Sequence, residues 1–128
     1  MIEKNSDKLI YLKNKFKKSN IYNCDLEKLS SIKNTLKKIK KKFSIIDTII
    51  HTASLVGTSN LTGWNTKFSN QNISNFNKNF KINVCSIFFI VQQLEKNLNK
   101  SKNPSIINIG SIYGQKTPDW SIYKNTNI

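Results

Sequence analysis

Apolar residues recur at helical spacing in three stretches of the chain, with lysine, asparagine and serine at most of the remaining positions. Intervals of three and four residues predict helices over residues 5–18, from 25 to about 43, and from about 73 to 100. Asp25 is the expected N-cap of the second helix, because its carboxylate can accept a hydrogen bond from a first-turn amide. The apolar positions are Leu9, Leu12 and Phe16 in the first helix, Leu29, Ile32, Leu36, Ile39 and Phe43 in the second, and Phe76, Phe80, Val84, Ile87, Val91, Leu94 and Leu98 in the third.

Short apolar runs separate these helices and predict strands at residues 20–24, 45–50 and 105–109. The run at 45–50, IIDTII, is nearly continuous in β-branched residues, as in strands that are buried on both faces of a parallel sheet. Residues 55–72 are rich in Gly, Ser, Thr and Asn and are expected to form a long ordered loop. The order helix-strand-helix-strand-helix-strand predicts an α/β fold, a partial Rossmann-like, doubly wound parallel sheet in one domain over residues 1–128.

The chain carries a net charge of +14, which alone would suggest nucleic acid or an anionic surface as a partner. All 21 basic residues are lysine, however, whereas the bidentate fork that suits phosphate and guanine belongs to arginine. The abundance of Asn, Ile and Lys is explained at least as well by an A- and T-rich coding sequence. The composition therefore argues against nucleic-acid binding.

The cysteines and the hydrophobic runs indicate in which cellular compartment the protein is expected. Cys24 and Cys85 have no close Cys or His partner, so neither a disulfide framework nor a metal site is predicted. The longest apolar run, residues 84–91, is far below the roughly 20 residues that span a bilayer, and the N-terminal residues alternate charged and apolar side chains, unlike a signal peptide. We therefore expect a cytoplasmic protein without a membrane anchor.

Small or polar residues end each predicted strand: Asp25 the first, residues 51–54 (HTAS) the second, and Gly110 with Ser111 the third. Because the carboxyl ends of parallel strands meet at one edge, these residues would share the edge at which open α/β folds bind ligands. Ser111 has two interpretations at this stage, an ordinary turn former or a hydroxyl placed for chemistry. His51 is likewise open to a structural or a functional interpretation.

These strand ends, taken with the third helix, resemble the short-chain dehydrogenase/reductase family over nearly the whole chain. CDLEKLSSIKNTLKKIKKKFSIIDTIIHTAS is similar to that family's Asp-bearing strand end, its next helix and its Asn-Asn-Ala-Gly strand. KINVCSIFFIVQQL resembles the central helix with the active-site asparagine, here Asn83. PSIINIGSIYG resembles the strand that delivers the catalytic serine, here Ser111.

The resemblance implies an oxidoreductase that transfers hydride between a small carbonyl or alcohol substrate and NAD or NADP, with the choice of cofactor left open. Ser111 would polarise the substrate carbonyl, and Asn83 would hold a helix kink and a water. Of the family's Asn-Asn-Ala-Gly motif only Ala53 is kept. The residues implied at the cofactor are Asp25, at the adenine ring, with Leu26, His51, Thr52, Ala53 and Ser54.

Two parts of the family's machinery are missing from the sequence. No Gly-rich turn follows an initial strand, so nothing presents backbone amides to a pyrophosphate. The absent first strand would be central in the usual order 3-2-1-4-5-6, so a gap in the sheet is expected. The resemblance implies a proton-donor tyrosine with a lysine four residues on, whereas Asn127 stands four residues after Tyr123. Either Tyr123 is a loop residue and the Tyr-x-x-x-Lys pair would lie beyond Ile128, or Tyr123 belongs to a degraded site. We therefore expect a fragment that is inactive alone.

A second class of function stays open. The same sequence could be a non-catalytic, lysine-rich, Rossmann-like module that binds an acidic partner. For the full-length enzyme the resemblance implies a homo-oligomer that pairs through long helices. The residues Phe76, Phe80, Val84, Ile87 and Val91 offer one half of such an interface, so this chain is expected to self-associate loosely.

Overall fold

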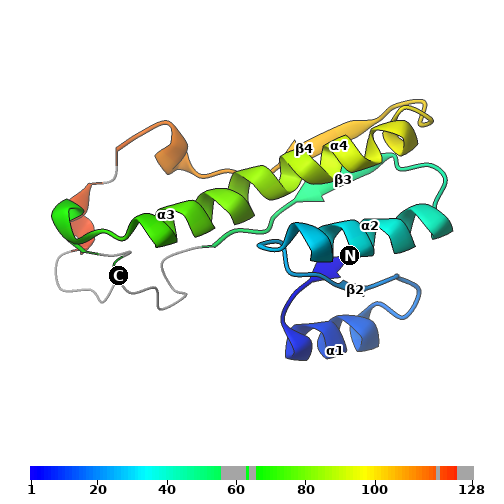
Figure 1. The fold of residues 1–128 in the computed structure, drawn as a ribbon, viewed down its shortest axis with the longest axis horizontal. Coiled ribbons are helices and arrows are strands. Elements are labelled where there is room, and N and C mark those ends of the chain that lie inside the picture. Colours follow the sequence, from blue (N-terminus) through cyan, green and yellow to red (C-terminus); the bar gives the residue numbers. More distant parts are fainter. Residues whose placement is uncertain (56–62, 64–65, 118, 124–128) are drawn as a thin grey trace.

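The computed structural model describes residues 1–55, 63, 66–117 and 119–123. Within them short strands alternate with helices, and α3 and α4 run end to end along the length of the molecule (Figure 1). The strands are β1 (Ile2–Glu3), β2 (Tyr22–Asn23), β3 (Thr48–His51) and β4 (Ser105–Asn108). The helices are α1 (Ser6–Lys15), α2 (Leu29–Lys42), α3 (Ile73–Phe80) and α4 (Ser86–Leu98), with a π-helical segment, Lys81–Cys85, between α3 and α4.

The strands form two parallel pairs, β1 with β2 and β3 with β4. The predicted α/β fold of parallel strands joined by helices is confirmed. The expectation that a helix comes first is wrong, because β1 precedes α1 and pairs with β2, Ile2 opposite Tyr22. A two-residue strand is too short to produce a hydrophobic period of its own, and only its partner strand defines it.

The core lies between α2, α4 and the strands beside them. Its buried members are Cys24, Ile32, Leu36, Ile90, Leu94 and Leu98. Fully burying one such side chain contributes about 1.5 to 3 kcal/mol, so this cluster is the main source of stability. Ile49 of β3 packs against it from the sheet.

The opposite face of β3 and β4 is open in the described part of the chain. Ile50 is 61% exposed, and Ile107, its partner in the register, is 45% exposed. The prediction that the strand at 45–50 is buried on both faces is therefore wrong. One face of this β-branched strand packs on the core, and the described residues leave its other face uncovered.

The starts of the helices differ in detail from the sequence pattern. Asp25 does not cap α2: Lys28 is at the N-cap and makes no side-chain cap bond. Asp25 Oδ1 instead accepts a hydrogen bond from Glu27 N, at 3.1 Å, in the turn before the helix. The third predicted helix is interrupted by the π-helical segment, and most of the expected loop over 55–72 lies outside the described residues.

Candidate active-site edge

The ends of β3 and β4 lie side by side, as the sequence predicted. His51 is opposite Asn108 in the parallel register, and Ile109 N donates to His51 O at 3.0 Å, so the pairing continues just past both strands. The residues that follow, 52–54 on one strand and 110–111 on the other, therefore leave the sheet at the same edge. This is the edge at which open α/β sheets bind ligands.

Asn83 ties the long helix to the chain that leaves β3. Its Oδ1 accepts from Leu55 N at 2.8 Å, and its Nδ2 lies 3.4 Å from Leu55 O and donates to Asn79 Oδ1 at 2.9 Å. Asn79 Nδ2 also donates to Leu55 O, at 2.9 Å. Asn83 lies in the middle of the π-helical segment, and such segments within α-helices are frequent at functional sites. The structure thus brings Asn83 to the ligand edge.

Ser111 follows β4 at the same edge and is exposed. Its Oγ accepts from Tyr113 N at 3.2 Å and caps the short turn Ile112–Gly114. The interpretation of Ser111 as a turn former is therefore correct for the local backbone. It does not exclude the chemical one, because this bond uses an oxygen lone pair and not the hydroxyl proton.

His51 points away from the edge. The imidazole is 8% exposed, and its Nε2 lies 3.4 Å from Ser86 Oγ, which itself donates to Ile82 O at 2.6 Å. Burial lowers the pKa of His51 below its ordinary value of 6.5, so the ring is neutral in the folded protein at pH 7. This placement favours the structural interpretation of His51.

The ends of β1 and β2 carry two carboxylates. Asp25 Oδ2 pairs with Lys4 Nζ at 3.1 Å. Partial burial raises the pKa of Asp25, but the hydrogen bond from the Glu27 amide and the Lys4 ammonium outweigh it, so that the pKa is lowered overall. Glu3, at the end of β1, accepts from Lys4 N at 2.8 Å and Asn5 N at 2.9 Å through Oε1. Glu3 was not among the predicted site residues, because β1 was not predicted. The only sign of this site in the sequence was an acidic residue that follows an apolar one at the start of the chain.

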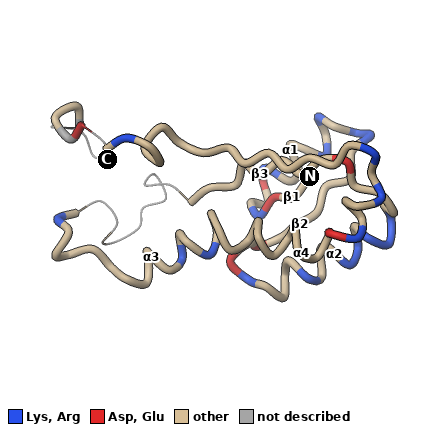
Figure 2. The backbone as a smooth tube through the Cα atoms, turned by 90° about the horizontal axis from the view of Figure 1, so that it is seen from above, with Lys and Arg blue, Asp and Glu red and all other residues tan. Residues whose placement is uncertain are grey.

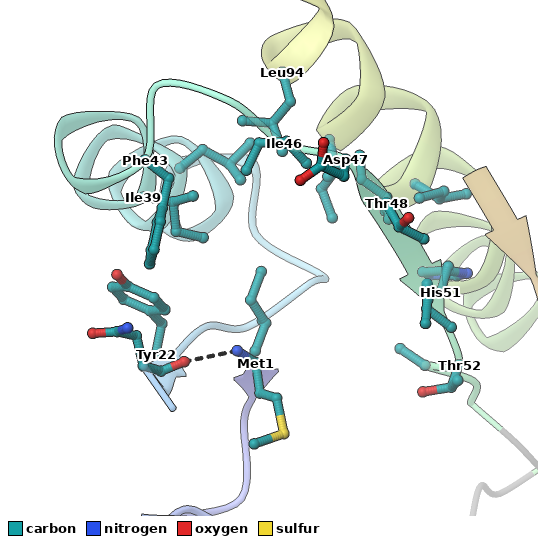
Figure 3. A pocket seen from close by; sticks show the side chains of 18 of the residues that line it. Met1, Tyr22, Ile39, Phe43, Ile46, Asp47, Thr48, His51, Thr52 and Leu94 are labelled. Atoms are coloured by element: carbon teal, nitrogen blue, oxygen red, sulfur yellow. Dashed lines mark hydrogen bonds between the residues drawn. The ribbon is translucent and has the colours of Figure 1, made fainter. Parts of the chain in front are cut away.

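A cavity of about 580 Å³ lies between the two strand pairs (Figure 3). Figure 3 shows Met1 and Tyr22 on one side of it and Thr48, His51 and Thr52 on the other. Leu26 and Ala53, two of the predicted cofactor residues, both line this cavity. Ser54 is exposed beyond it, next to Leu55.

The two interpretations of Tyr123 concern residues at the end of the described chain. Tyr123 ends a short turn, Trp120–Tyr123, but its side chain, like Asn127, lies outside the described residues. Within the described part of the chain, no group of three or more His, Cys, Asp or Glu residues could hold a metal ion. No helix among these residues is long and apolar enough to cross a membrane.

Parallel strands joined by helices, with an asparagine at a break in the long helix, form a partial Rossmann-like α/β domain. The family model for short chain dehydrogenases matches residues 1–126, and the chain belongs to this family. No curated protein matches the chain.

Several solved structures share the fold. A short chain dehydrogenase from Shigella flexneri 2a strain 301, in complex with NADP, is 21% identical, with a TM-score of 0.76 over 91% of this chain and 49% of that one. FabI from Candidatus Liberibacter asiaticus is 16% identical, with a TM-score of 0.77 over 91% and 45% of the two chains. ElxO with bound NADP is 22% identical, with a TM-score of 0.73 over 94% and 48%. The chain thus spans about half the length of each of these structures.

Proposed function

We propose that this chain is part of a cytoplasmic, NAD(P)-dependent oxidoreductase that interconverts a small carbonyl compound and an alcohol. The observation that carries the proposal is the bond between Asn83 and Leu55, which fixes the π-helical segment beside the strand ends that lead to Ser111. This places an amide and a hydroxyl at one edge of a parallel sheet, where ligands bind.

Ser111 is the residue that acts on the substrate. A nicotinamide cofactor, when bound, supplies or accepts the hydride. The Ser111 hydroxyl donates a hydrogen bond to the carbonyl oxygen of the substrate and stabilises the negative charge that develops there. One such donor typically contributes about 3 to 4 kcal/mol to the transition state. Asn83 is a positioning residue, because it holds the helix and the strand end in register.

The described residues fit one half of a dinucleotide. Glu3 and Asp25 present carboxylates at the ends of β1 and β2, and Leu26 with Ala53 gives an apolar contact for an adenine ring. The sequence has no glycine before Gly57, so this chain offers no Gly-rich turn to the pyrophosphate. The adenosine half would therefore bind weakly by itself, and the chain alone would not turn over.

Glu3 supports a preference for NAD. Oε1 is held by two main-chain amides, and the second carboxylate oxygen has lone pairs for a ribose hydroxyl. An acidic residue in this part of a dinucleotide fold bonds the ribose 2′-hydroxyl, and its charge would repel a 2′-phosphate. Two of the similar structures hold NADP, so this chain and those proteins would differ at the ribose.

An NMR titration of the chain with adenosine 5′-phosphate tests the proposal. We expect fast-exchange amide shifts at Glu3, Asn5, Asp25 and Glu27, with millimolar affinity. Adenosine 2′,5′-bisphosphate should bind less well, and Glu3→Gln should reduce that difference. Glu95→Gln, on α4, is the matched charge control. Shifts that spread over the lysine face of α2 instead would contradict the proposal.

The alternative module for an acidic partner has less support. Figure 2 shows most of the lysines at the end of the molecule that holds α1 and α2, with others along α3 and near the opposite end. Several make contacts within the chain: Lys33 lies over the Phe89 ring at 5.8 Å, and Lys40 Nζ donates to Gln93 O at 3.4 Å. Lys33 thus covers apolar surface, as long cationic side chains commonly do. Binding to a polyanion that falls steeply with salt would favour the alternative.

Self-association remains a prediction about the apolar stripe that runs from α3 through the π-helical segment into α4. Phe76, Phe80 and Val84 are 60%, 50% and 47% exposed, and the two phenylalanine rings stack at 6.4 Å. Ile87 and Val91 are partly buried, so only the first half of the stripe is available. Sedimentation should show weak, concentration-dependent association that Phe80→Ser reduces. A monomer that does not change with concentration would exclude it.

A further inference from the structure

Helix α1 exposes apolar side chains on the side that faces away from the core. Leu9 is buried, whereas Ile10 and Tyr11, which follow it directly, are 61% and 56% exposed. Successive residues of an α-helix are turned by about 100°, so Ile10 and Tyr11 lie on the outer side of α1. Single exposed apolar residues are common on protein surfaces, but neighbours on one short helix form a patch.

A lysine joins Tyr11 to a second aromatic ring. Lys15 Nζ donates to Tyr11 Oη at 2.9 Å and lies 5.4 Å from the centre of the Tyr11 ring. The same ammonium group lies 5.7 Å from the centre of the Phe16 ring, and Phe16 is 41% exposed. One cation is thus held beside two exposed aromatic rings at the C-terminal end of α1. With the two lysines that follow, these residues form the α1 patch: Ile10, Tyr11, Lys15, Phe16, Lys17 and Lys18.

The surroundings of the α1 patch are strongly basic. Residues 8–24 contain five lysines and no acidic residue, and residues 28–46 contain seven lysines and likewise no acidic residue. The two stretches meet in space, because Lys42, the last residue of α2, donates to Asn20 Oδ1. Asp7, the one acidic residue of α1, is in the first turn, at the other end of the helix. A partner of the α1 patch should therefore be negatively charged.

The basic face of α2 differs from the α1 patch. Of the residues of α2, only Leu29, in the first turn, is a large apolar residue that is exposed. A charged face without apolar residues is typical of a helix that meets water. The α1 patch places apolar side chains among lysines, and water does not favour these side chains. Its partner should therefore offer apolar contact as well as negative charge.

The surface of an anionic bilayer offers both. Phospholipid headgroups attract lysines without the fixed fork geometry that arginine supplies, and this chain has no arginine. Aliphatic and aromatic side chains such as Ile10 and Phe16 enter the boundary between headgroups and acyl chains, where tyrosine is also enriched. A nucleic-acid duplex would match the charge but would give Ile10 little apolar contact. The observations therefore favour a lipid surface.

We propose that the α1 patch binds the surface of membranes that contain anionic phospholipids. The apolar side chains of the patch enter the headgroup boundary, and its lysines contact the phosphates. The lysines after α1 lie at the side of the molecule where β2 and β3 begin, whereas the ligand edge is at the other ends of these strands. The contact thus leaves the ligand edge accessible. The inference goes beyond the proposed oxidoreductase function and does not rest on it.

Flotation of the whole chain with vesicles tests the proposal. At physiological salt we expect binding to vesicles of phosphatidylcholine and phosphatidylglycerol in equal parts, and no binding to phosphatidylcholine alone. Replacing both Lys17 and Lys18 by glutamine should weaken binding about tenfold or more, since each lysine near an anionic membrane contributes about fivefold. Replacing Lys67 and Lys116 by glutamine removes the same charge outside the patch and should weaken binding less than about threefold, because membrane attraction falls off within a Debye length.

A second pair of variants separates apolar contact from charge. Ile10→Ser should weaken vesicle binding about tenfold, because the serine loses the apolar contact. Ile73→Ser is the matched control, since Ile73 is 71% exposed at the start of α3, and it should leave binding unchanged. Both residues are exposed, so both variants should fold, which circular dichroism checks. In bicelles of the same lipids with a nitroxide on the acyl chains, the NMR signals of Ile10 and Tyr11 should broaden and those of Ile73 should not.

Three results would overturn the proposal. The first is a lack of binding to the anionic vesicles at physiological salt. The second is an equal loss of binding in the patch variants and in their controls, which would show attraction by net charge alone. The third is binding to duplex DNA that is tighter than binding to the vesicles and unaffected by Ile10→Ser, which would assign the lysines to nucleic acid.

Discussion

Removing the Asn83 amide tests whether the helix break is held by the strand end. In Asn83→Ala the Leu55 amide loses its acceptor at 2.8 Å, and Asn79 loses its contact at 2.9 Å. A partly buried amide without a partner costs about 1 to 3 kcal/mol. The 3.4 Å contact to Leu55 O adds little, since Asn79 still donates to that oxygen at 2.9 Å. Alanine's higher helix propensity returns roughly 0.5 kcal/mol. We therefore expect a net loss of about 0.5 to 2.5 kcal/mol.

Urea unfolding followed by circular dichroism measures this loss, and hydrogen exchange at Leu55 locates it. Asn77→Ala is the matched control, because Asn77 is exposed on α3, four residues before Lys81, and should be neutral or slightly stabilised. Asn79→Ala should couple with Asn83→Ala, since both side chains bond to Leu55, so the double variant should lose less than the sum. The reasoning is refuted if Asn83→Ala costs no more than Asn77→Ala and leaves exchange at Leu55 unchanged.

Other consequences concern pH, the core and catalysis. The lowered pKa of His51 means that the unfolded chain binds its proton more readily, so stability should fall as the pH drops below about 6.5, towards the folded-state pKa. Urea midpoints between pH 7.5 and 5.5 check this, and His51→Gln should remove most of the trend. Leu36→Ala should cost about 2 to 5 kcal/mol in urea unfolding, because Leu36 is 1% exposed. Leu29→Ala, at a position that is 55% exposed, should cost less than about 1 kcal/mol, and equal losses would contradict the packing described for α2. The chain alone should not oxidise NADH or NADPH with carbonyl substrates; turnover that disappears in Tyr123→Phe would show a working donor and overturn the expectation of inactivity.

Much of the fold was readable from the sequence, because its helices and longer strands have clear hydrophobic periods. The apolar residues at Ile32 and Leu36 of α2 and at Ile90 and Leu94 of α4 do form the core. β1 was missed, because two residues carry no period. The exposed face of β3 was missed as well, because a β-branched run does not show what lies on each side of it.

The site was predictable at its strand ends and less so inside the helix. Ser111 and residues 52–54 share one edge because parallel pairing requires it. The π-helical segment around Asn83 depends on a bond to Leu55, 28 residues away, which no local pattern contains. The sequence offered one sign of the π-helical segment, the two successive intervals of four between Phe76, Phe80 and Val84. A π-helical turn contains an extra residue, which lengthens the interval between apolar positions. The sequence correctly placed His51 at the end of its strand. The direction of the imidazole depends on its contact with Ser86, which the sequence did not show.

The position of a bound adenine ring tests the central claim most directly. Leu26 and Ala53 both line the cavity and carry methyl groups, so intermolecular NOEs from the adenine protons of adenosine 5′-phosphate can place the ring. We expect NOEs to both methyl groups, with NOEs from the ribose protons to Glu3. NOEs to neither methyl group, with the nucleotide held against the lysines of α2, would show that the strand ends are not a dinucleotide edge in this chain.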